Sequence, residues 1–163
     1  MVELKNLTQL KNYLSQMGGF VEQALHEATQ ALIERKTDRL DKTEEIESKI
    51  NECHLIIDQG CMNLLAKLSP FASDLRLILA CYKMNHDLER MGDHATNISR
   101  GARKYLSRKE VPIEKDFLQL VNEVRWMVKS SLDSFVNKDA AKADEVLKRD
   151  DVVDDLKDKL VIQ

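Results

Sequence analysis

Glu89 and Asp93 are the residues of this sequence whose types and spacing could do chemistry. They stand four residues apart within the run 84–98, which reads MNHDLERMGDHATNI. Residues four apart lie on one face of a helix, and two carboxylates held that close repel each other unless a cation lies between them. The pair therefore indicates either a metal site or a solvated acidic stripe, and both interpretations stay open at this point.

The neighbouring turns of the same helix add two more candidate ligands. Asn97 follows Asp93 by one turn, and His86 precedes Glu89 by about one turn. An oxygen-rich set of this kind suits iron, manganese, zinc or magnesium better than a soft metal. We predict Glu89, Asp93 and Asn97 as metal ligands. One helix offers too few ligands, so further carboxylates would come from a neighbouring helix, with Glu44, Glu45, Glu47, Asp150, Asp151, Asp154 and Asp155 as candidates.

The composition predicts an all-helical protein. The chain has 163 residues, a third of them charged, with only five glycines and two prolines. Apolar residues recur at helical spacing in five segments, which predict long helices over about 7–32, 46–68, 71–107, 117–135 and 143–160. Short connections between long helices favour an up-down antiparallel bundle. We therefore expect a mainly aliphatic core, since aromatic residues are scarce.

The third of these segments carries both a core stripe and the acidic pair. At about 100° per residue, its apolar side chains fall on one side: Leu77, Cys81, Met84, Leu88, Met91, Ala95, Ile98 and Ala102. Gly92 lies between this stripe and the acidic face. A glycine inside a helix costs about 1 kcal/mol against alanine, which indicates close approach of another backbone or of a bulky ligand cluster.

Charge and hydropathy exclude several classes of partner. A net charge of −3 gives no general attraction to nucleic acid, and the basic segment that begins at Arg100 lacks interleaved aromatic residues. No run of about 18 apolar residues predicts a membrane span. Three cysteines, an odd number without secreted-domain spacing, indicate reduced thiols and a cytoplasmic location. No phosphate loop, catalytic triad context or zinc-protease motif is found, so we expect no enzyme.

Two longer motifs connect the chain to a known family. The run 70–76, PFASDLR, precedes the run 87–98, DLERMGDHATNI, and the segment 14–25, LSQMGGFVEQAL, lies upstream of both. Together they resemble the PhoU family, which pairs a Pro-x-Ala-x-Asp-Leu-Arg helix start with a Glu/Asp-x-x-x-Asp motif. The resemblance covers essentially the whole chain. It assigns Glu89 and Asp93 to the motif, and Asn97 to the turn that follows.

The resemblance implies an accessory and signalling role in phosphate transport. Its expected partners are the ATPase subunit of the phosphate ABC transporter and a sensor histidine kinase, and its expected effect is to restrain phosphate uptake and the starvation response. Some members carry iron or zinc clusters on the motif, so iron, zinc or manganese is the expected metal. We also expect a homodimer or higher oligomer, without nucleic acid and without direct membrane insertion.

The same resemblance implies a fold of two three-helix repeats. We assign residues 1–110 to a complete repeat and 111–163 to a partial repeat of two helices, which suggests a truncated member of the family. The fourth and fifth helices should then expose apolar faces. Two alternatives remain: a cytoplasmic regulatory domain of a sodium–phosphate cotransporter, and a helical-bundle metalloprotein. The latter would need Glu-x-x-His motifs, which this sequence lacks.

Overall fold

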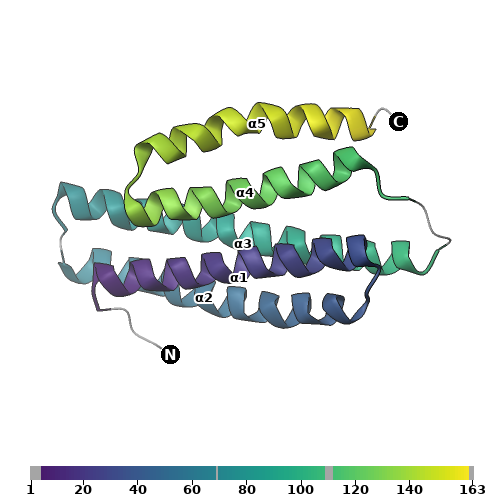
Figure 1. The fold of residues 1–163 in the computed structure, drawn as a ribbon. Helices are drawn as coiled ribbons and strands as arrows, with labels where there is room; N and C mark the ends of the chain where they lie inside the picture. Colours follow the sequence, from purple (N-terminus) through teal and green to yellow (C-terminus); the bar gives the residue numbers. More distant parts are fainter. Residues whose placement is uncertain (1–4, 69, 109–111, 162–163) are drawn as a thin grey trace.

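The structure, a computed structural model, describes residues 5–68, 70–108 and 112–161 and shows an antiparallel arrangement of long helices (Figure 1). The helices are α1 (Leu7–Glu34), α2 (Asp38–Leu68), α3 (Ala72–Leu106), α4 (Lys115–Asn137) and α5 (Ala140–Val161). No strand occurs among the described residues. The prediction of an all-helical bundle is therefore confirmed. The predicted boundary between the two repeats, at residues 110 and 111, lies outside the described residues, and the division itself stays a prediction.

Helices α1, α2 and α3 pack against one another as a three-helix bundle with an aliphatic core. Leu10, Leu14, Met17 and Val21 recur at intervals of three or four along α1 and are at most 1% exposed. They meet one buried stripe from α2 and another from α3. Burying one such side chain contributes about 1.5–3 kcal/mol. Burial of these apolar side chains therefore stabilises the bundle.

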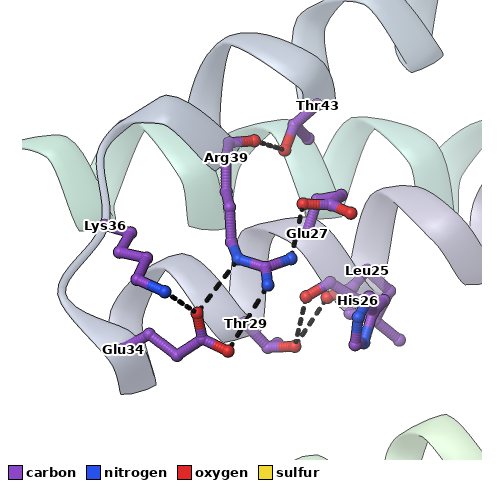
Figure 2. Close-up of polar contacts among 8 residues, drawn as sticks. All are labelled: Leu25, His26, Glu27, Thr29, Glu34, Lys36, Arg39 and Thr43. Carbon is purple, nitrogen blue, oxygen red and sulfur yellow. Dashed lines mark hydrogen bonds and ion pairs between the residues drawn. The ribbon is translucent and has the colours of Figure 1, made fainter.

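The turn between α1 and α2 is closed by one arginine and two carboxylates (Figure 2). The Nη1 of Arg39 in α2 donates a hydrogen bond to Oε2 of Glu27 in α1, with 2.9 Å between the two atoms. The Nε of Arg39 lies 3.3 Å from Oε2 of Glu34. Arg35 ends α1 in the left-handed conformation, with φ of 53°. Glu27 is mostly buried, so this pair is charge-assisted within a partly dry environment. The Arg39–Glu27 ion pair therefore helps to hold the first turns of α2 against α1.

Helices α2 and α3 are joined by polar side chains that bond main-chain carbonyls. The Nδ2 of Asn85 donates to His54 O at 3.1 Å, and Ser99 Oγ donates to Leu40 O at 3.3 Å. Both side chains are buried, and these bonds satisfy their donors, whereas Asn85 Oδ1 has no partner within the described chain. These bonds set the antiparallel register of the two helices.

The buried stripe of α3 differs in part from the predicted one. Cys81, Leu88, Ala95 and Ala102 are buried as expected. Met91 was expected in the core but is 39% exposed. Its place is taken by small and polar residues, because the buried positions of the helix also include Asn85, Gly92, Thr96 and Ser99.

The hairpin of α4 and α5 rests on the bundle through one helix. Among the described residues, α1 is the only bundle helix with Cα atoms within 8 Å of those of α4, and Cα atoms of α5 come that close only to those of α4. Leu132 of α4 packs directly over Gly18 of α1. Leu147 of α5 is 72% exposed, and Leu156 is the one described residue of α5 that is buried. The predicted uncovered apolar face is therefore present.

Candidate functional site

The predicted carboxylates occupy the middle of α3 and point away from the core. Glu89 is half-buried, and both Asp93 and Asn97 are exposed. No hydrogen bond or ion pair within 4 Å joins any of the three to another residue of the described chain. Their oxygens are therefore available to an external ligand.

Gly92 lies beside this pair for a steric reason. A Cβ placed on it would lie 2.9 Å from Ile50 Cδ1 and 3.2 Å from Ile50 Cγ2. The glycine thus lets a side chain of α2 approach the backbone of α3. The close approach therefore comes from a side chain of a neighbouring helix, whereas the sequence indicated another backbone or a ligand cluster.

The oxygen donors fit a hard or borderline cation in type but not in number. Within residues 5–68, 70–108 and 112–161, no three His, Cys, Asp or Glu side chains gather closely enough to hold a metal ion. Iron, manganese and magnesium sites usually need more oxygen ligands than two carboxylates and one amide. The described chain therefore supplies at most part of a metal site, and the assignment of Glu89, Asp93 and Asn97 stays a prediction.

The two groups of carboxylates proposed to complete the site differ in their position. Helix α2, which carries Glu44, Glu45 and Glu47, packs against α3. Helix α5 does not, since no Cα atom of its described residues lies within 8 Å of one in α3. The candidates on α5, Asp150, Asp151, Asp154 and Asp155, therefore belong to a helix that does not pack against α3 of the same chain.

His86 belongs to an aromatic cluster that the sequence did not suggest. Its ring lies edge-on to Tyr82, with centroids 4.8 Å apart, and 5.2 Å from the ring of His54 on α2. The Nδ1 atom of His54 is buried and has no hydrogen-bond partner within the described chain. His54 and His86 are 32 positions apart in sequence, so only the register of α2 against α3 brings them together.

The three cysteines are buried core residues. No disulfide links Cys53, Cys61 and Cys81. Burial raises the pKa of the Cys61 thiol to about 12 and that of Cys81 to about 11. Thiols with such pKa values are weak nucleophiles and poor metal ligands at neutral pH. They contribute packing, as the sequence suggested for Cys53 and Cys61.

An apolar groove of about 560 Å³ lies between α1, α3 and α4, close to the N-terminal end of α4. Its lining is contributed by side chains of four helices and includes Leu25, Leu32, Ile98, Tyr105, Phe117, Leu120, Val124 and Leu160. Together with the exposed apolar residues of α5, it shows that the hairpin side of the molecule is incompletely covered.

No helix in the described part of the chain is both long and apolar enough to cross a membrane.

These features define an all-helical protein in which a three-helix bundle is followed by a helical hairpin. The profile of the PhoU domain matches residues 14–102 and 117–163, which together make up more than half of the chain. The chain therefore belongs to the PhoU family.

Curated relatives and solved structures agree with this assignment. The chain is 36% identical over 151 residues to the phosphate-specific transport system accessory protein PhoU homolog of Pseudomonas putida, covering 91% of this chain and 58% of that protein. It is similar to the crystal structure of PhoU from Pseudomonas aeruginosa, with a TM-score of 0.91 and 34% identity over 94% of this chain and 74% of that one. The regulatory protein PhoU from Streptococcus pneumoniae gives a TM-score of 0.82 and 27% identity, covering 92% and 70%. The chain thus spans less than two thirds of the length of the P. putida protein.

Proposed function

We propose that this chain is an accessory regulator of a phosphate-specific ABC transporter that acts by docking and has no catalytic turnover. The observation that supports this function is the match of the PhoU domain over residues 14–102 and 117–163, together with the fold similarity to PhoU of P. aeruginosa. Relatives that share a third of their residues with the chain are named as accessory proteins of that transport system.

The proposed partners are the ATPase subunit of the transporter and a sensor histidine kinase. By binding both in the cytoplasm, the protein would restrain phosphate uptake and the starvation response when phosphate is plentiful. Exposed apolar side chains on the bundle support a docking role, since covering apolar surface with a partner is favourable. Leu55 and Met62 of α2 are 68% and 55% exposed, and they stand two turns apart on one helix face.

A binding assay with the purified ATPase subunit tests this docking role. We expect the wild-type chain to retain the subunit and Leu55→Glu to weaken retention by about tenfold, because a charge replaces an apolar contact. Gln119→Glu is the matched control, since Gln119 is exposed on α4, which does not pack against α2, and receives the same charge. The proposal is wrong if the folded wild-type chain retains neither the ATPase subunit nor the kinase.

For the acidic pair we propose a shared metal site. Glu89 and Asp93, with Asn97, would bind iron, zinc or manganese together with carboxylates of a second chain, and so favour a homodimer or higher oligomer. The bound cation would neutralise the facing carboxylates and hold the two surfaces together. The incomplete ligand set on α3 supports this arrangement, because the described chain lacks a third nearby carboxylate, histidine or cysteine.

Elemental analysis after loading with each metal tests the shared site. We expect the double variant Glu89→Ala/Asp93→Ala to lose stoichiometric metal and metal-dependent association, with unchanged far-UV circular dichroism. The control is Asp151→Ala/Asp155→Ala, which removes two exposed carboxylates at the same spacing from α5. Equal metal content in the two double variants would remove the acidic pair from the site and leave the docking proposal standing.

A further inference from the structure

A polar hollow of about 300 Å³ lies between α1 and α4, apart from the acidic pair on α3. Helix α1 contributes Glu22 and Leu25 to its wall, and α4 contributes Asn122, Arg125, Trp126, Val128 and Lys129. A water molecule takes up about 30 Å³ of liquid, so the hollow has room for a polyatomic ion with part of its hydration shell.

Two cations of α4 line this hollow, and neither forms an ion pair with another described residue. Arg125 and Lys129 are four residues apart and therefore lie on the same helix face. No ion pair within 4 Å and no hydrogen bond connects either side chain to another residue of the described chain. Other charged groups of the hairpin are paired: Glu123 bonds Arg149 at 2.6 Å, and Asp133 bonds Lys142 at 3.3 Å. These two hairpin carboxylates, Glu123 and Asp133, therefore have partners other than Arg125 and Lys129.

The single carboxylate in the wall does not neutralise them. Burial raises the pKa of Glu22, and Asp133 acts in the same direction, whereas Lys129 and Arg125 lower it. Glu22 is therefore partly desolvated, and it attracts the two cations electrostatically without forming an ion pair within 4 Å. The lining carries two positive charges against one negative charge, so an anion is the ligand that this charge balance favours.

We propose that the hollow between α1 and α4 binds a tetrahedral oxyanion of the phosphate class, with Arg125 and Lys129 as its charge partners. The planar guanidinium of Arg125 can donate two parallel hydrogen bonds to such an ion, and the ammonium of Lys129 acts as a point charge. The amide of Asn122 and the indole N–H of Trp126 are further donors in the wall. This site goes beyond the docking role, because it requires no partner protein.

Trp126 provides the assay, because it is the only tryptophan of the chain and lines the hollow. The purified protein is titrated with inorganic phosphate at constant ionic strength set by sodium chloride, and tryptophan fluorescence is recorded. We expect a saturable change for phosphate and sulfate, and binding of chloride and acetate weaker by at least about tenfold. A linear response, or equal responses to all four anions, would overturn the proposal, since it would report screening without a site.

Three variants and one control locate the site. Arg125→Gln and Lys129→Gln should each raise the dissociation constant for phosphate by about fivefold or more, because each removes a charge-assisted bond. Glu22→Gln should lower it, since a repelling charge disappears. Lys115→Gln is the matched control: it removes an equal charge from the same helix, about 15 Å from Arg125 along the helix axis. Saturable binding that is unchanged in both α4 variants, with native circular dichroism, would place the ion elsewhere and refute this site.

Discussion

Replacing Gly18 with alanine tests how the hairpin is attached to the bundle. The new Cβ would lie 2.6 Å from Cδ2 and 2.8 Å from Cδ1 of Leu132, and 3.2 Å from its Cγ. Carbon atoms are optimally 3.5–4.0 Å apart, so the Leu132 side chain must shift by up to about 1 Å. Overpacking of this kind costs about 1–3 kcal/mol. Alanine also gains about 1 kcal/mol over glycine as a helix former, so the net effect combines two opposing contributions.

Gly19→Ala separates these two contributions. Gly19 lies next in α1, and nothing is found within 4 Å of a Cβ placed there. The helix-propensity gain is common to both variants, so their difference in unfolding free energy isolates the contact with Leu132. We expect Gly18→Ala to be less stable than Gly19→Ala by about 1–3 kcal/mol. In a Leu132→Ala background the difference should nearly vanish, because the opposing side chain is gone.

Urea unfolding monitored by two probes measures this difference. Far-UV circular dichroism follows all the helices, whereas the fluorescence of Trp126 follows α4. If Gly18→Ala loosens the hairpin alone, the fluorescence transition moves to lower urea than the dichroism transition. Equal stability of the two alanine variants, with coincident transitions, would show that Leu132 does not pack tightly against Gly18 in solution.

Three further predictions use other features of the fold. Gly92→Ala should be less stable than Gly101→Ala by about 1–3 kcal/mol in urea unfolding, because its Cβ would lie 2.9 Å from a side chain of α2 while nothing lies within 4 Å at Gly101. Burial raises the pKa of Glu22 in the folded state, so unfolding free energy should fall as pH rises through the window above its ordinary pKa. Glu22→Gln should therefore match the wild type near pH 4 and exceed it at pH 7 in denaturation experiments. The thiols of Cys61 and Cys81 should resist a thiol reagent at pH 8 in the native protein, whereas all three cysteines should react after unfolding; fast native labelling would contradict their burial.

The helices could be predicted from the sequence because each repeats its apolar residues at intervals of three and four. The predicted third helix, 71–107, agrees closely with α3 at Ala72–Leu106. The face it buries was predicted less well. Hydropathy places Met91 in the core, but Asn85 and Ser99 take buried positions by bonding carbonyls of α2. Such positions depend on a partner helix, and the periodicity of one helix does not contain it.

The candidate sites could likewise be predicted where they lie within one helix, and could not where they depend on two. Glu89 and Asp93 could be paired from their spacing, because both belong to one helix. The contact of His54 with His86, and the placement of Glu22 opposite Arg125, depend on the register between two helices. The spacing of Arg125 and Lys129 at i and i+4 was the available signal for the hollow. Nothing in the sequence shows that these cations lack partners among the described residues.

The position of α1 has a mechanical consequence. Among the described residues it is the only bundle helix with Cα atoms within 8 Å of those of the hairpin. The closest backbone packing between α5 and the bundle therefore runs through α4 and α1. A displacement of α1 would change the position of the hairpin relative to α2 and α3.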